Sequence, residues 1–389
     1  MSVTTPVSAV MKTATRTRLF TPGPVEIPAR VLRALSEIPP HHRTDVFRQQ
    51  FLRVTEELKW LHGTKGEVFM LTGSGTGGMQ ATVTNIMAPG EKALAVVGGK
   101  FGERWSNLLT AFEIPHDVIE VEWGAPLDPA AIAKKLDADA GITTVYTTYS
   151  ETSTGTVYDI KGFSDVTRAR GRRLVVDAIT GLGVHELPQD EWGIDVIVGG
   201  SQKGLMVPPG VATVSIAPWA ASYIEGKKLP RFYYDLQKAR KLAPKGETPW
   251  TPAVSLIMAL EESLKMMKEE GLETLIERHR RLALAMHAGA KGAGYTLFSK
   301  SPAHSLTALH PPDGVNATDV IKRLRDVHGM VVAGGQDHLK GKILRVGHMG
   351  GYDLFDIIAV CSALEECANA FGHTCSGAAG AARRAWVEA

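Results

Sequence analysis

Residues 196–210 read Val-Ile-Val-Gly-Gly-Ser-Gln-Lys-Gly-Leu-Met-Val-Pro-Pro-Gly. The apolar start predicts a buried strand, and Lys203 follows that strand closely, with glycines on both sides. Lysine rarely enters a protein interior without a function, and burial lowers the pKa of its amine until the neutral form can condense with an aldehyde. The Pro-Pro-Gly that follows forces a rigid, non-helical path, which would fix the lysine in place.

The preceding predicted strand ends in an acid. Residues 174–178 read Leu-Val-Val-Asp-Ala, so Asp177 comes directly after an apolar run. Partial desolvation of this carboxylate costs roughly several kcal/mol unless it meets a cation or a strong donor. A protonated pyridine nitrogen is such a partner. Taken alone, the same acid would equally well be a helix N-cap or a loop acid.

A glycine-rich loop precedes both segments. Residues 72–78 read Thr-Gly-Ser-Gly-Thr-Gly-Gly between a predicted strand and a predicted helix. Glycines let backbone N–H groups point at an anion, and the helix N-terminus adds positive potential, while Ser74 and Thr76 can add hydroxyl donors. The loop lacks the lysine of a P-loop and the GxGxxG spacing, so ATP and NAD are less favoured than another phosphate. A plain strand-to-helix link is the alternative.

Strands and helices alternate around these loops. Seven short apolar runs suit strands buried on both faces: 68–72, 93–98, 118–121, 144–148, 174–176, 196–198 and 211–216. Helical stretches between them predict an α/β fold with a mainly parallel sheet covered on both sides. Ligands of such sheets bind beyond the carboxyl ends of the strands, where Asp177 and Lys203 stand.

The chain divides into four predicted parts. Residues 1–18 would be a flexible arm, 19–265 a large cofactor-binding domain, 266–375 a small C-terminal domain, and 376–389 a flexible tail. The arm is basic and rich in Ser and Thr, which loosely resembles a transit peptide, so organellar targeting stays open. The tail is rich in Ala and Gly, which predicts poor order. One long helical stretch, interrupted at Gly271, would connect the two domains.

Composition excludes several classes of function. A formal net charge of +2 gives no sign of nucleic acid or an anionic membrane as partner. No apolar run reaches the ~18 residues of a membrane span. The three cysteines, Cys361, Cys367 and Cys375, lack CxxC spacing, which argues against a metal site. So sparse a set fits a reducing compartment, and we expect a cytoplasmic protein. Helical spacing places Cys361 on a stripe that faces a core.

The segment around Lys203 resembles the class V aminotransferases, and among them the alanine–glyoxylate and serine–pyruvate types. Further matches follow in order along the chain: 21–24 (Thr-Pro-Gly-Pro), 73–76 (Gly-Ser-Gly-Thr), 101–104 (Phe-Gly-Glu-Arg), 151–155 (Glu-Thr-Ser-Thr-Gly), 248–252 (Thr-Pro-Trp-Thr-Pro) and 344–347 (Leu-Arg-Val-Gly). The resemblance implies pyridoxal 5'-phosphate (PLP) as cofactor. It also implies fold type I of the PLP-dependent transferases, with a seven-stranded sheet and a smaller α+β domain.

The resemblance also implies a role for each matching residue. Lys203 would bind the cofactor aldehyde and later carry the proton, and Asp177 would pair with the pyridinium. The phosphate would be held by Ser74, Gly75, Thr76 and Gln202, and by Thr248 from a partner subunit, which implies a homodimer with shared active sites. Thr152 would bond the ring's 3-oxygen region, and Ile179 and Phe101 would pack on its two faces. Phe101 as plain core packing is the alternative.

Two further residues are expected to hold the substrate. Arg345 would bind the α-carboxylate of the substrate, and the alternative is that Arg345 is a surface arginine at a strand end. The backbone around Gly23 would close over the substrate. Such a pocket suits Ala, Ser, Gly, pyruvate or glyoxylate. His41, His42 and Arg43 lie in a predicted loop that either approaches the mouth of the site or is simply solvated.

The implied function is transfer of an amino group from alanine or serine to glyoxylate or pyruvate, in two half-reactions with ping-pong kinetics. Transamination of 2-aminoethylphosphonate is an alternative. A cysteine desulfurase or another PLP lyase is disfavoured, because residues 345–349 read Arg-Val-Gly-His-Met without the cysteine expected there. A catalytically silent binding subunit is disfavoured by Lys203 and Asp177.

Overall fold

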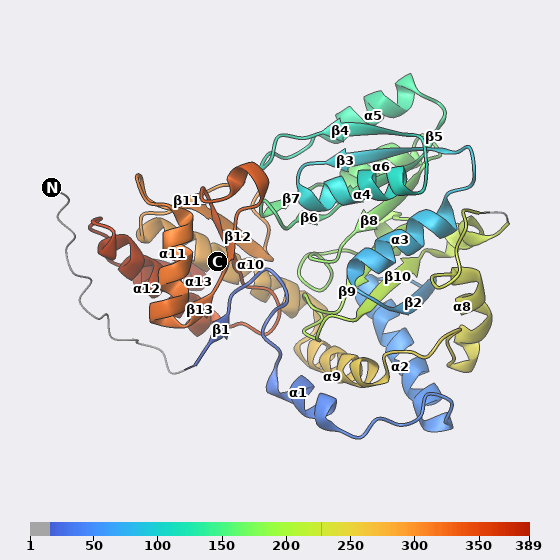
Figure 1. The fold of residues 1–389 in the computed structure, drawn as a ribbon, viewed down its shortest axis with the longest axis horizontal. Helices are drawn as coiled ribbons and strands as arrows, with labels where there is room; N and C mark the ends of the chain where they lie inside the picture. Colours follow the sequence, from blue (N-terminus) through green and yellow to red (C-terminus); the bar gives the residue numbers. More distant parts are fainter. Residues whose placement is uncertain (1–15, 227) are drawn as a thin grey trace.

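The computed structural model describes residues 16–226 and 228–389, so most of the predicted arm, residues 1–15, lies outside the described part. Its centre is a seven-stranded sheet in the order β2-β10-β9-β8-β5-β3-β4 (Figure 1). The strands are β2 (Glu67–Thr72), β3 (Lys92–Val97), β4 (His116–Glu120), β5 (Ile142–Thr148), β8 (Arg173–Asp177), β9 (Val196–Gly200) and β10 (Val211–Ile216). Only β10 runs antiparallel to its two neighbours, so the prediction of a mainly parallel seven-stranded sheet is confirmed.

Helices cover both faces of this sheet. One face packs on α3 (Gly75–Ile86), α4 (Lys100–Ala111), η1 (Pro218–Ile224) and α8 (Leu236–Leu242). The short helix η2 (Ala243–Lys245) follows α8 directly and contacts it. The other packs on α2 (Asp45–His62), α5 (Pro129–Ala138), α6 (Ile160–Arg168) and α9 (Val254–Glu270), with α1 (Ala29–Ser36) against α9 and α7 (Gln189–Trp192) beside α6. Strand residues alternate between the two cores: Val175 packs with α3 and α4, while Leu174 and Val176 pack on the opposite side.

A second, smaller core lies toward the C-terminus (Figure 1, orange and red). Its elements are α10 (Leu272–Gly292), β11 (Thr296–Leu297), β12 (Leu306–His310), α11 (Ala317–His328), β13 (Met330–Val331), β14 (Ala333–Gly334), η3 (Asp337–Leu339), β15 (Leu344–Gly347), α12 (Leu354–Ala370) and α13 (Ala378–Glu388). A four-stranded sheet, β11-β12-β15-β14, runs through it. Gly271 separates α9 from α10 with a φ of 84°, as the predicted interruption required.

In the described part of the chain, two pairs of short strands lie outside the two larger sheets. β1 (Arg18–Leu19) pairs in parallel with β13, and Phe20, just after it, is fully buried in the small core. β6 (Ser150–Glu151) pairs with β7 (Thr156–Val157) and forms a tight loop directly after β5. The N-terminal segment therefore leaves the small core and crosses to the large sheet (Figure 1, blue).

The end of the chain differs from the expectation of a flexible tail. α13 packs along α10 and α12, and Ala378 and Ala382 are fully buried. Small alanines let the helices approach closely, and they also favour helix formation, so a composition that suggested disorder makes a packed helix. Arg18, assigned to the arm, lies in β1. Cys361 is fully buried, as its place on the apolar stripe predicted. Among the described residues, no helix is long and apolar enough to cross a membrane.

Candidate active site

A cavity of about 180 Å³ opens at the carboxyl ends of β2, β8 and β9. It is lined by Gly23, Ser74, Gly75, Thr76, Phe101, Arg104, Ser150, Thr152, Asp177, Ile179, Thr180, Gln202 and Lys203. Parallel strands bring their carboxyl ends to one edge of the sheet, which is why loops from distant parts of the sequence meet here. Most residues predicted to contact the cofactor line this one cavity; Thr248 does not.

Lys203 reaches the cavity from the loop after β9. Its side chain is 7% exposed, and Nζ donates a hydrogen bond to the carbonyl oxygen of Pro22. The loop is held by Ser201, whose hydroxyl donates to the carbonyl of Pro208 at 2.7 Å and accepts from the N–H of Val211 at 3.2 Å. Burial is the main cause that lowers the pKa of Lys203 to about 8, Asp177 opposes the shift, and Arg345 and Arg104 add to it. The amine thus remains mostly protonated at pH 7, but its neutral fraction is far larger than that of an ordinary lysine.

Gly23 touches this lysine. A Cβ at position 23 would lie 2.5 Å from the Cδ, Cε and Nζ atoms of Lys203, and its φ of 119° disfavours any other residue. The N-terminal segment therefore passes against the lysine with no room for a side chain at position 23.

Asp177 ends β8 and is 3% exposed. Within the described residues, the one hydrogen bond to its carboxylate comes from the N–H of Ile179, at 2.9 Å. Burial raises the pKa of Asp177 to about 7, although that hydrogen bond and the charges of Arg104 and Lys203 work against the shift. The carboxylate thus lacks a close cationic partner, and binding of a cation would offset the cost of its burial.

The glycine-rich loop forms the start of α3. Ser74 is the N-cap residue, yet its hydroxyl makes no capping hydrogen bond, so it stays available to a ligand. Gly75 has no room for a side chain, because a Cβ there would overlap the Ile179 side chain. The amide oxygen of Gln202, on the facing loop, is buried without a hydrogen-bond partner among the described residues. A helix N-terminus flanked by unused polar groups is suited to an anion.

Arg345 lies on β15 of the small domain and is 7% exposed, so it is not a surface arginine. Nε donates to the carbonyl of Gly334 and Nη1 to the carbonyl of Thr152, each at 2.9 Å. Thr152 lines the cavity, and its hydroxyl lies 2.8 Å from that of Thr180. Burial lowers the pKa of Arg345 to about 10, which leaves it charged at neutral pH, and the negative charge of Glu151 favours that charged form.

Glu151 had no role in the sequence analysis, yet it organises one side of the cavity. It is fully buried and accepts hydrogen bonds from the N–H groups of Phe101 (3.1 Å) and Gly102 (2.9 Å), and from Ser153. These two N–H groups belong to the first turn of α4, so the carboxylate caps a helix whose N-cap residue, Gly99, has no side chain to do so. Glu151 thereby fixes Phe101 at the cavity wall.

Three further lining residues went unassigned: Arg104, Ser150 and Thr180. Each stands within four residues of a predicted one, and Arg104 follows Phe101 at the i+3 spacing that puts two side chains on one helix face. The spacing could have indicated Arg104. Nothing local could have indicated the capping role of Glu151, because the α4 N–H groups that it accepts from are about fifty residues away in the sequence.

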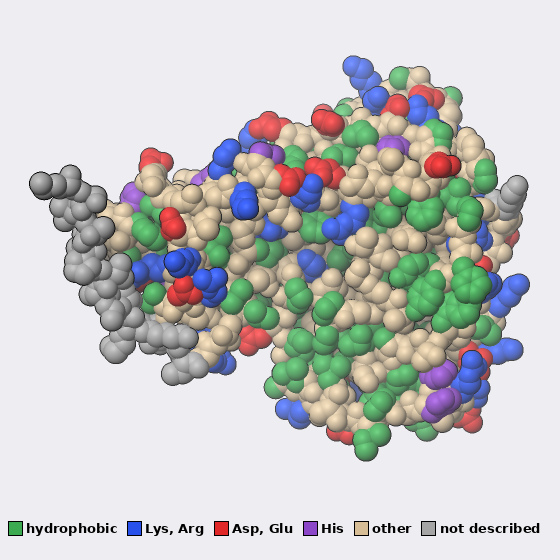
Figure 2. Space-filling view, in the orientation of Figure 1, with side chains coloured by type: hydrophobic (Ala, Val, Ile, Leu, Met, Phe, Trp, Pro, Cys, Tyr) green, Lys and Arg blue, Asp and Glu red, His purple; other side chains and the backbone are tan. Residues whose placement is uncertain are grey.

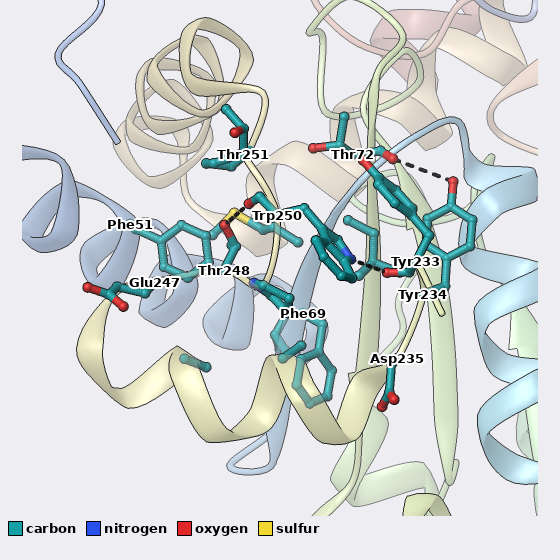
Figure 3. A pocket seen from close by; sticks show the side chains of 17 residues that line it. Phe51, Phe69, Thr72, Tyr233, Tyr234, Asp235, Glu247, Thr248, Trp250 and Thr251 are labelled. Carbon is teal, nitrogen blue, oxygen red and sulfur yellow. Dashed lines mark hydrogen bonds between the residues drawn. The ribbon is translucent and has the colours of Figure 1, made fainter. Parts of the chain in front are cut away.

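Three groups of predicted residues lie outside the cavity lining, and one of them is Arg345, which contacts the lining through the carbonyl of Thr152. Thr248 lines a separate surface groove, where its hydroxyl donates to the carbonyl of Trp250 at 2.6 Å (Figure 3). His41, His42 and Arg43 lie between α1 and α2, with the two imidazole rings 4.5 Å apart, and none of the three lines the cavity of its own chain.

A family model described as class-V aminotransferase matches residues 19–347. The soluble hydrogenase 42 kDa subunit of Anabaena cylindrica is 42% identical to this chain and covers 94% of it and 97% of its own length. Serine–glyoxylate aminotransferase of Methylorubrum extorquens is 32% identical, with 90% of each protein covered. The structure of pyridoxamine–pyruvate aminotransferase from Mesorhizobium loti is similar with a TM-score of 0.91 at 26% identity, over 96% of this chain and 98% of that one.

Proposed function

The chain belongs to the class V aminotransferases, a PLP-dependent family, and we propose that it transfers the amino group of alanine or serine to glyoxylate or pyruvate. The observation that carries this proposal is the cavity that has the amine of Lys203 and the unpaired carboxylate of Asp177 in its wall. The similarity to a serine–glyoxylate aminotransferase supports the substrate class.

The residues of the cavity fit PLP. The buried carboxylate of Asp177 needs a cation, and a protonated pyridine nitrogen provides one. The unused hydroxyl of Ser74 at the N-terminus of α3 and the unpartnered amide oxygen of Gln202, whose side chain also carries an N–H₂ donor, suit a phosphate ester. Ile179 and Phe101 supply two apolar surfaces for a flat ring.

When bound, PLP supplies an aldehyde that combines with amino groups and a cationic ring that stabilises negative charge on the substrate's α-carbon. Lys203 would hold that aldehyde in the resting enzyme, and its Nζ would carry the proton taken from the substrate's α-carbon. The lowered pKa of Lys203, about 8, suits this exchange near neutral pH. Asp177 would keep the ring nitrogen protonated.

Arg345 would orient the substrate. Two of its N–H groups are already bonded to backbone carbonyls, so the guanidinium is held in place before a carboxylate arrives. Pro22 and Gly23 close the space above Lys203, which restricts the side chain that a substrate can carry. These contacts favour small amino acids with one carboxylate.

The first prediction concerns the substrate. With PLP bound, we expect kcat/KM for alanine or serine with glyoxylate or pyruvate to exceed that for aspartate by at least about 10-fold, because a second, unpaired carboxylate loses hydration worth more than ~1.4 kcal/mol. A panel of alanine, serine, glycine, aspartate and 2-aminoethylphosphonate against glyoxylate, pyruvate and 2-oxoglutarate measures this. Parallel double-reciprocal plots would support ping-pong kinetics. Preference for aspartate or for 2-aminoethylphosphonate would reject the proposed substrate class.

We also propose that two copies form a dimer through the groove that contains Thr248. Phe51, Phe69, Tyr233, Tyr234 and Trp250 line it (Figure 3), and Phe232, 69% exposed, stacks on Trp250 with the ring centroids 4.9 Å apart. Figure 2 shows hydrophobic side chains gathered on this side of the molecule, in the region of α8. Exposed aromatic side chains such as Phe232 and Tyr233 are typical of an interface, and a partner there would bring its own Thr248 toward the first subunit's cavity.

The second prediction tests this interface. Phe232→Glu is expected to convert the dimer to monomer and to weaken PLP binding, because a carboxylate would be buried among aromatic rings. Phe355→Glu is the matched control: Phe355 is 76% exposed on α12 of the small domain, and its replacement should leave the dimer intact. Light scattering coupled to size-exclusion chromatography reports the mass. A wild-type protein that is monomeric and fully active would contradict the shared site.

We propose the cytoplasm as the place of action. Cys361 and Cys367 are buried and Cys375 is partly buried, and all three are free thiols, which is typical of a reducing compartment.

A further inference from the structure

Arg104 stands inside the cavity but has no role in the function proposed so far. It lies on α4, one turn after Phe101. Its Nη1 donates to the hydroxyl of Thr76 at 2.9 Å, and its guanidinium carbon lies 4.7 Å from the centre of the Phe101 ring. The guanidinium is thus held between an aromatic face and the glycine-rich loop that begins α3.

The charge of Arg104 has no anionic partner in the described part of the chain: no carboxylate there lies within ion-pair distance of it. Lys100, on the same helix, differs in this respect, because its amine lies 2.5 Å from Glu103 and 2.8 Å from Asp337. The hydrogen bond of the Arg104 side chain goes to Thr76 and its ring contact is with Phe101, and both are neutral groups. A partly buried cation in the cavity wall, with no carboxylate of the described residues in ion-pair contact, favours binding of an anion there.

We propose that Arg104 binds the phosphate group of the cofactor, together with the backbone and hydroxyl donors of Ser74, Gly75 and Thr76. The inference rests on the proposed cofactor site. Near neutral pH a phosphate ester carries about −1.5 to −2 charges, and a helix N-terminus supplies only about half a positive charge. The guanidinium supplies the missing unit charge and a planar pair of N–H donors matched to phosphate oxygens.

The position of Arg104 favours the cofactor phosphate over the substrate carboxylate. Its hydrogen bond goes to Thr76, a residue of the loop at the N-terminus of α3, whereas Arg345 approaches from the small domain through Thr152. The two arginines therefore attach to different loops of the cavity wall. Its charge also lowers the pKa values of both Asp177 and Lys203, so Arg104 acts on the same cavity electrostatically.

The test compares PLP with pyridoxal, which has the same ring and aldehyde but no phosphate. For Arg104→Met in the cofactor-free protein, we expect PLP affinity to fall about 10- to 100-fold while pyridoxal affinity stays within about twofold of wild type, because only the phosphate loses a charge-assisted contact. Arg104→Lys should recover part of the loss. Lys100→Met removes the same charge from the same helix and should leave both affinities unchanged. Equilibrium titration followed by absorbance gives the affinities without any turnover.

The outcomes separate this inference from the proposed function. A wild-type protein that binds PLP much more tightly than pyridoxal, with an Arg104→Met variant that is equally selective, would overturn the role of Arg104 and leave the cofactor site standing. Equal losses for PLP and pyridoxal would show a structural effect and also overturn it. An unchanged PLP affinity with a raised KM for the amino donor would assign Arg104 to the substrate instead. A wild-type protein that binds neither compound would reject the proposed function itself.

Discussion

Lys203→Ala is expected to abolish the covalent link to PLP and to lower kcat by at least about 10³-fold, since the same amine binds the aldehyde and moves the α-proton. Its Nζ is buried against the carbonyl of Pro22, and within the cavity lining no other amine is available to replace it. Borohydride reduction followed by peptide mass spectrometry should label Lys203 in the wild type and no lysine in the variant. The visible absorbance of lysine-linked cofactor should disappear in parallel.

Two controls keep this result interpretable. Lys203→Arg retains the positive charge but cannot condense with an aldehyde, so it should be as inactive as the alanine variant. Lys300→Ala removes a lysine whose side chain is 65% exposed and should keep full activity. Circular dichroism and the thermal midpoint establish that the variants are folded. Normal turnover by a folded Lys203→Ala protein would remove the basis of the proposed mechanism.

Asp177→Asn should act in opposite directions on activity and on stability. In the PLP-bound enzyme, loss of the charge leaves a buried ring cation unpaired, which at about 3–5 kcal/mol corresponds to a loss of roughly 10²- to 10³-fold or more in kcat. In the cofactor-free protein, the asparagine oxygen can still accept from the N–H of Ile179, while the cost of a buried charge disappears.

The pKa shift of Asp177 also determines how the stability of the cofactor-free protein changes with pH. Folding raises the pKa of Asp177 from an ordinary value of 3.8 to about 7, so between these values the folded state binds more protons than the unfolded state. The free energy of unfolding of the cofactor-free wild type therefore falls as pH rises through this window, by an amount on the order of a few kcal/mol, and is level above it. Asp177→Asn lacks this decrease.

Urea unfolding of both cofactor-free proteins measures the difference. Near pH 4, at the lower end of this window, the two should have similar stability, and near pH 8 the asparagine variant should be the more stable by roughly 1–4 kcal/mol. Asp137→Asn is the control, because Asp137 is an exposed acid paired with Arg170 and its loss should not stabilise the protein. An Asp177→Asn variant that is less stable than wild type near pH 8 would show that a partner inside the protein already stabilises the carboxylate.

Local sequence was sufficient to predict the parts of the site that depend on strand ends. Lys203, Asp177 and the Ser74–Thr76 loop each follow an apolar run within a few residues, and a parallel sheet gathers such loops at one edge. The same reasoning misjudged the C-terminal helix α13, because an Ala-rich composition describes a packed helix and a loose tail equally well until its neighbours are known.

The sequence by itself determined the order of strands and loops, and with it the chemical groups at the carboxyl edge, because hydrophobic periodicity and glycine positions are local properties. Only the tertiary structure decided which distant groups meet there: Glu151 at the first turn of α4, Arg345 against Thr152, Arg104 against Thr76 and Gly23 against Lys203. These contacts join residues that are about 30 to 190 positions apart, and they form because the burial of two separate cores fixes the relative placement of helices and strands.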